Sequence, residues 1–192
     1  MDVDLWVTTL SGRGERVAQR RDLVRRVLAP YLGCAPEAVE IERRCALCGH
    51  PGHGKPRVRG GGIHFSATSA NALAVVAVSR GGELGIDVAD PAALGATLGH
   101  PLPRCLLSAG EAAAVAAAPH RVAALGRLWV RKEALAKATG TGLAVDAEAV
   151  DTTADPLPGG FRLHDLDDVR GYRAALATAA PLGALVARDA DG

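Results

Sequence analysis

The chain has 192 residues, a mass of 19.7 kDa and a formal net charge of +1 at pH 7. A chain of this length forms one large domain or two small ones and can bury a core without disulfide bonds. The near-neutral charge argues against a general nucleic-acid-binding protein, which carries a clear basic excess. No apolar run of about 18 residues is present and the N-terminus is acidic, so we expect a cytoplasmic protein without a membrane segment.

The charges are unevenly distributed along the chain. Residues 1–60 contain 11 cations and 7 acids, whereas residues 61–192 contain 11 cations and 14 acids. Most of the basic excess falls in one predicted helix, at Arg13, Arg16, Arg20, Arg21, Arg25 and Arg26. That helix is either a solvated basic surface or a site for phosphates or an acidic partner. Lysine, in contrast, occurs only at Lys55, Lys132 and Lys137.

The first 90 residues predict several strands, one helix and a glycine-rich loop. Apolar residues at helical spacing predict a helix over 15–33, which ends at Gly33. Strands are predicted over 3–10, 39–41, 63–65, 72–78 and 83–88. We expect a polar turn over 66–71, and a β-hairpin in which Arg80-Gly81-Gly82 joins the last two strands.

Proline and glycine between residues 90 and 104 predict a linker, which divides the chain into halves 1–90 and 91–192. Ser108 and Glu111 have capping-box spacing and begin an alanine-rich helix, and a second helix over 122–139 ends at Gly140. Strands are predicted over 145–150, 161–166, 172–178 and 184–187. The order lacks the strand–helix alternation of a Rossmann fold, so the predicted fold class is α+β.

Three charged residues stand out as candidates for chemistry. Asp87 lies inside an apolar strand, where an unpaired charge costs several kcal/mol, so it needs a metal, a cation or water. Glu133 and Lys137 are four residues apart and share one face of the second helix. The alternative is that they form an ordinary surface ion pair.

The run from Trp129 to Leu143 resembles a known signature. It reads W-x-x-K-E-A-x-x-K followed by G-x-G-L, as in 4'-phosphopantetheinyl transferases of the surfactin-synthetase-activating type. Three further segments agree in order: Gly54-Lys55-Pro56, Phe65-Ser66-Ala67-Thr68 and Gly85-Ile86-Asp87-Val88. The alanine- and arginine-rich composition also fits a GC-rich genome, as in actinobacterial members of this family.

The resemblance implies two similar halves related by pseudo-twofold symmetry, with coenzyme A in the cleft between them. It implies a holo-[acyl-carrier-protein] synthase that uses Mg²⁺ (or Mn²⁺). Such an enzyme transfers the phosphopantetheine arm to a serine of an acyl or peptidyl carrier protein and releases adenosine 3',5'-bisphosphate. In this family the carriers often serve polyketide or nonribosomal peptide synthesis, which is secondary metabolism. We expect a monomer.

The resemblance also assigns roles to residues. Asp87 and Glu133 would bind the metal, because Mg²⁺ prefers oxygen ligands. Glu133 would take the serine proton directly or through a water molecule, and Lys137 would contact the phosphates. The residues implied to bind coenzyme A are Gly54, Lys55, Pro56, Ser66, Ala67, Thr68, Lys137, Arg20 and Arg21. All three lysines lie in the matching segments, so we expect their ammonium groups at the coenzyme.

Two positions depart from the family pattern. Ala67 stands where the family usually has histidine, and Ala89 where it often has a second acid. Asp90 is a poor substitute for that acid unless the strand breaks before Pro91, because successive strand residues face opposite ways. We expect an active enzyme with two carboxylates on the metal; the alternative is a non-catalytic relative that binds carrier protein or coenzyme A without transfer.

A Cys-His cluster precedes the Gly-Lys-Pro segment. It comprises Cys45, Cys48, His50 and His53. The single Cys-x-x-Cys is typical either of a loop with free thiols, which we expect, or of a structural zinc site. A more distant alternative for the whole chain is a zinc-knuckle interaction module.

Overall fold

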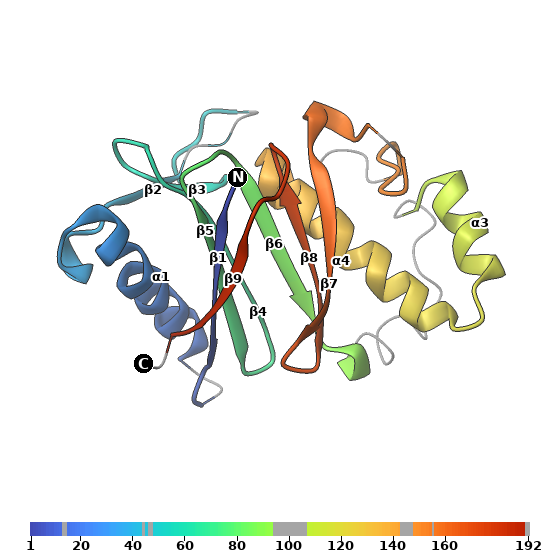
Figure 1. The fold of residues 1–192 in the computed structure, drawn as a ribbon, viewed down its shortest axis with the longest axis horizontal. Coiled ribbons are helices and arrows are strands. Elements are labelled where there is room, and N and C mark those ends of the chain that lie inside the picture. The colour runs from blue at the N-terminus through green and yellow to red at the C-terminus, as the bar shows by residue number, and fades with distance from the viewer. Residues whose placement is uncertain are drawn as a thin grey trace.

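The computed structural model describes residues 1–12, 15–43, 45, 48–93, 107–142, 148–154 and 156–190 (Figure 1). The N-terminal elements are β1 (Val3–Thr9), α1 (Arg16–Leu32), β2 (Ile41–Arg43), β3 (Pro56–Val58), β4 (His64–Ala70), β5 (Leu73–Ser79) and β6 (Leu84–Ala89). The later ones are α3 (Ala109–Ala117), α4 (Arg121–Thr139), β7 (Arg162–Val169), β8 (Tyr172–Thr178) and β9 (Leu185–Asp189). This mixture agrees with the predicted α+β class. Among the described residues, no helix is both long and apolar enough to cross a membrane.

The strands form two main sheets and one small hairpin. The first sheet has the order β4-β5-β1-β9, the second has the order β6-β8-β7, and β2 pairs with β3. Helix α1 packs on the outer face of the first sheet and α4 packs on the outer face of the second, while the inner faces of the two sheets pack together (Figure 1). The layers therefore run helix, sheet, sheet, helix.

Strand β5 shows why the sequence reads as an unbroken apolar run there. Ala74, Val76 and Val78 belong to the core against α1, whereas Leu73, Val75 and Ala77 belong to the core between the sheets. All seven residues of β5 are buried. A strand covered on both faces needs apolar side chains at every position.

The expected hairpin between 72–78 and 83–88 is wrong. Strand β5 pairs with β1 on one edge and with β4 on the other, so neither edge is available to β6. Strand β6 instead pairs antiparallel with β8, with Asp87 opposite Ala175. The chain thus passes from the first sheet to the second at residues 80–82, whereas the two halves were expected to meet at residue 90.

Other boundaries also differ from the expectation. The segment 66–71 is mostly strand β4 rather than a turn, and the chain reverses at Asn71, whose φ is 48°. The strand expected over 39–41 begins at Ile41 and has an unforeseen partner in β3. Strand β9 pairs parallel with β1 and so joins the first sheet. Of the strand expected over 145–150, residues 148–150 are not strand and the remainder lies outside the described residues.

The helix ends agree with the sequence. Ser108 caps α3 with the full capping box to Glu111. Helix α4 ends at Gly140, whose φ of 78° is left-handed. These ends are set by local residue chemistry, which is why they could be predicted.

Candidate active site

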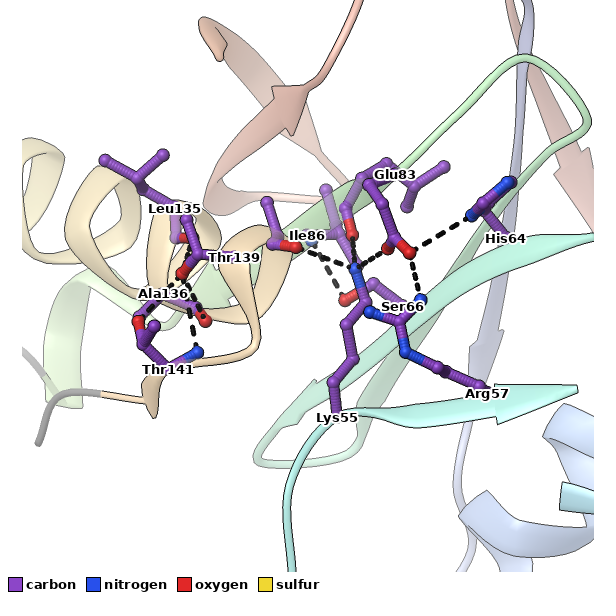
Figure 2. Close-up of polar contacts among 12 residues, drawn as sticks. Lys55, Arg57, His64, Ser66, Glu83, Ile86, Leu135, Ala136, Thr139 and Thr141 are labelled. Atoms are coloured by element: carbon purple, nitrogen blue, oxygen red, sulfur yellow. Dashed lines mark hydrogen bonds and ion pairs between the residues drawn. The ribbon is translucent and has the colours of Figure 1, made fainter. Parts of the chain in front are cut away.

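The two sheets meet along the unpaired edge of β6, and side chains satisfy that edge. The Lys55 ammonium donates to the Leu84 carbonyl at 2.8 Å, and the Ile86 N–H donates to Ser66 Oγ at 3.1 Å (Figure 2). The Lys137 ammonium donates to the Ile86 carbonyl at 3.3 Å. Because exposed strand edges need partners, this edge fixes the positions of all three side chains.

Helix α4 crosses β6 at Gly85. A Cβ atom at Gly85 would overlap the Ala134 carbonyl oxygen and the Ala138 nitrogen. Only glycine therefore permits this close approach of helix and strand. The approach brings one face of α4, with Glu133 and Lys137, to the Asp87 side of the strand.

Asp87 is 6% exposed and accepts two hydrogen bonds on one oxygen. Its Oδ1 lies 2.5 Å from Lys137 Nζ and accepts from Thr68 Oγ1 at 2.9 Å. Lys137 Nζ also donates to Thr68 Oγ1 at 3.1 Å. Among the described residues Oδ2 has no hydrogen bond, so this oxygen remains available to a ligand in the cavity that Asp87 lines.

Glu133 has a carboxyl group without a hydrogen bond to any described residue. Burial raises its pKa, and the negative charge of Asp87 raises it further, while Lys137 opposes the shift. The Lys137 ammonium group thus offsets part of the negative charge of both carboxylates, Asp87 and Glu133. We call Asp87, Glu133 and Lys137 the acidic corner.

A cavity of about 1050 Å³ opens over the acidic corner. Arg20 and Arg21 reach it from α1 and Arg43 reaches it from β2. Arg20 Nη1 also donates to Ser69 Oγ at 3.1 Å. A cavity of this size can hold a cofactor-sized ligand, and its basic wall suits an anionic one.

Lys55 is 9% exposed, and its ammonium group is engaged within the protein. It donates to Glu83 Oε2 at 2.5 Å and to the Ala138 carbonyl at 3.0 Å, besides the Leu84 carbonyl (Figure 2). Burial lowers the pKa of Lys55, although Glu83 opposes this shift. An ammonium group has three donors, so Lys55 ties the start of β3 to β6 and to the end of α4.

The remaining candidate residues are divided between the cavity and other contacts. Gly54, Pro56 and Ala67 line the cavity, and so do Ser66 and Thr68, whose hydroxyl groups already have partners. The Asp90 carboxylate accepts from the Asn71 side chain and the Ala92 N–H, and Asp90 does not line the cavity. Leu143 of the signature lies outside the described residues.

Lys132 does not lie at the cavity, contrary to the expectation from composition. It is buried and forms an ion pair of 2.7 Å with Glu111 of α3. This ion pair was not predicted, although the capping box places Glu111 at the start of α3. The available sequence signal for this ion pair was the capping-box glutamate, Glu111, at the start of an alanine-rich helix.

The comparisons with known proteins agree with this geometry. A family model described as the 4'-phosphopantetheinyl transferase superfamily matches residues 83–179, which is just over half of the chain and includes the whole acidic corner. No curated protein matches the chain. The chain belongs to the 4'-phosphopantetheinyl transferase superfamily.

Proposed function

We propose that this protein transfers the 4'-phosphopantetheine arm of coenzyme A to a serine of an acyl or peptidyl carrier protein and releases adenosine 3',5'-bisphosphate. It would act as a holo-[acyl-carrier-protein] synthase of the surfactin-synthetase-activating type. The observation that carries the proposal is the Glu133 carboxyl, which has no described hydrogen-bond partner beside the Asp87–Lys137 pair. The superfamily membership supports phosphopantetheinyl transfer in general.

The oxygen donors of the acidic corner fit Mg²⁺ (or Mn²⁺). Asp87 Oδ2 and the Glu133 carboxyl are available, and burial together with the nearby Asp87 charge raises the pKa of Glu133. Hard oxygen donors on neighbouring elements are typical of magnesium sites. When bound, Mg²⁺ neutralises charge on the diphosphate as its bond breaks. Asp87 and Glu133 would hold it.

Glu133 is the proposed proton acceptor. It lines the cavity and has no hydrogen bond to a described residue, so it can take a proton directly or through a water molecule. The serine hydroxyl gives its proton to Glu133, and the serine oxygen bonds to the phosphorus that carries the pantetheine arm. The bond from that phosphorus to the bridging diphosphate oxygen breaks, and adenosine 3',5'-bisphosphate leaves. Lys137, one helical turn beyond Glu133, balances the charge that develops on the phosphates.

Coenzyme A would lie in the cavity of about 1050 Å³. Arg20 and Arg21 would contact its phosphates, because both reach the cavity from α1. The Lys55 ammonium group already donates to three partners within the protein. We therefore propose that Lys55 acts by holding Gly54 and Pro56 at the cavity wall. The proposal also includes two halves, 1–90 and 91–192, that are related by pseudo-twofold symmetry. It further includes a monomeric state, a cytoplasmic location, an actinobacterial type and a carrier protein of polyketide or nonribosomal peptide synthesis.

The test is incubation with coenzyme A, Mg²⁺ and an apo carrier protein, followed by intact-mass measurement of the carrier. We expect the carrier to gain the mass of one phosphopantetheine arm. Absence of this gain across several carriers, with folded protein, would overturn the proposal. Coenzyme A binding without mass gain would instead support the non-catalytic alternative suggested by Ala67 and Ala89.

A further inference from the structure

Two cysteines and one histidine converge in the loop that closes the β2–β3 hairpin. The hairpin pairs Ile41 with Val58 and Arg43 with Pro56. Arg43 Nη1 donates to the Gly54 carbonyl at 2.9 Å and so closes the base of the loop. The loop is therefore anchored at both ends by backbone and side-chain contacts.

The ligand atoms of Cys45, Cys48 and His53 all lie within 4.8 Å of one another. Cys48 Sγ is 3.5 Å from His53 Nε2. On a tetrahedral zinc ion, a thiolate sulfur at about 2.3 Å and an imidazole nitrogen at about 2.0 Å from the metal lie about 3.5 Å apart. The observed spacing thus matches two corners of a zinc tetrahedron.

The backbone of the loop is shaped around this cluster. The Gly49 N–H donates to the Cys45 carbonyl at 2.9 Å, and the Cys45 N–H donates to the His50 carbonyl at 3.1 Å. Gly49 has a φ of 71°, which L residues rarely adopt. These contacts hold Cys45 beside residues 49 and 50.

His50 is not part of the cluster, although the sequence grouped it with the other three. Its Nδ1 accepts from the Gly52 N–H at 2.9 Å. Its ring stacks on that of His53, with the ring centres 5.1 Å apart. His50 therefore supports the orientation of His53 and leaves His53 as the histidine of the metal cluster.

We propose that Cys45, Cys48 and His53 bind one Zn²⁺ ion, with the fourth position open to water. Two thiolates and one imidazole form a typical zinc ligand set, and three protein ligands leave one position for solvent. Cys48 and His53 are exposed, so the metal can enter from solution. Cys45 and His53 also line the cavity, so the bound ion would fix the wall that carries Gly54 and Pro56.

The test uses the full-length, reduced, metal-free protein titrated with Co²⁺ and then with Zn²⁺. Tetrahedral thiolate-bound cobalt shows visible absorption bands and an ultraviolet charge-transfer band, which report this site and not a carboxylate site. We expect these bands to saturate at one ion per chain and to vanish on addition of Zn²⁺. Purified protein should contain one zinc by elemental analysis.

Matched variants assign the ligands. Cys48→Ser and His53→Ala should lower the cobalt affinity at least about 100-fold. Cys34→Ser, which removes an exposed thiol outside the loop, should leave the affinity unchanged. His50→Ala, which removes only the stacked ring, should lower it less than His53→Ala does. The proposal is overturned if the wild type binds no stoichiometric cobalt, if Cys48→Ser keeps full affinity, or if His50→Ala loses as much affinity as His53→Ala. Circular dichroism checks that each variant is folded.

Discussion

Lys132 and Lys137 lie on the same helix, yet their surroundings differ. Lys132 pairs with Glu111, whose side chain is 0% exposed and whose two oxygens are fully used. Glu111 Oε1 accepts from the Thr152 N–H and hydroxyl, and Oε2 accepts from the Ser108 N–H. Lys137 pairs with Asp87, while Glu133 beside it has no hydrogen bond to a described residue.

The difference separates a structural ion pair from a candidate catalytic one. Where each buried oxygen already has a donor, no ligand can bind without breaking a contact. Where carboxylate oxygens remain available around one cation, a metal or substrate can supply the missing partner. Lys132 therefore holds α3 to α4, whereas Lys137 on the same helix lines the cavity.

The largest expected effect is on stability, from Lys132→Met. Removing the ammonium leaves the Glu111 charge buried and unpaired, which should lower the free energy of unfolding by about 3–5 kcal/mol. Guanidinium denaturation measures this change. Adding Glu111→Gln should restore part of the loss, and transfer per folded molecule should stay within about threefold of the wild type. Equal stability of the single and double variants would contradict this assignment.

Asp87→Asn should have the next largest effect, on transfer. The amide keeps the shape but cannot supply the negative charge that Lys137 and the metal require, so kcat should fall at least about 100-fold. Asp165→Asn is the matched control, because Asp165 also pairs with cations of α4, Arg127 and Arg131, but does not line the cavity. It should lower stability and leave kcat near that of the wild type. A similar loss of kcat in both variants would show that the effect is not specific to the acidic corner.

Lys137→Arg should have a smaller effect. The compact ammonium group contacts Asp87, Thr68 and the Ile86 carbonyl at once, and a planar guanidinium group cannot reproduce this arrangement. We expect kcat/KM for coenzyme A to fall about 10-fold while the fold is retained. Steady-state kinetics measures this change, and unchanged kinetics would show that charge alone suffices.

The smallest effect concerns the pH dependence of Glu133→Gln in metal-free protein. Because the folded protein raises the pKa of Glu133, the folded state binds this proton more tightly than the unfolded state does, and the wild type loses stability as pH rises through the raised pKa. The Gln variant carries no such charge. Its Tm should equal that of the wild type near pH 4 and exceed it by pH 8.

Thermal scans at several pH values measure this difference. Mg²⁺ should raise the Tm of the wild type and not that of the variant, because a ligand stabilises only the state that binds it. A Tm difference that is constant with pH would contradict the assigned ionisation.

Local features of the fold could be predicted from the sequence, whereas strand pairing could not. The C-terminal end of α4 at Gly140 and the cap of α3 follow from residues within one turn of each helix. The pairing of β6 with β8 and of β9 with β1 joins residues distant in sequence. Sequence periodicity identifies the buried face of a strand but not which edge a distant strand occupies.

The candidate site shows the same division. Asp87 was singled out because a charge in an apolar strand needs a partner, and the structure supplies Lys137. The contacts of Lys55 and Lys132 were not predicted, because Glu83 and Glu111 come from elements whose positions depend on the packing of the whole chain. A lysine in a motif does not reveal whether its ammonium group faces a cavity or a carbonyl.

Transfer by Glu133→Gln, measured beside coenzyme A binding by the same protein, tests the central claim most directly. The carrier's mass and the calorimetric affinity for coenzyme A would be determined for the wild type and the variant at equal folded concentration. We expect the variant to bind coenzyme A within about 10-fold of the wild type while transfer falls at least about 100-fold. Transfer at the wild-type rate by Glu133→Gln would contradict the role of this carboxyl.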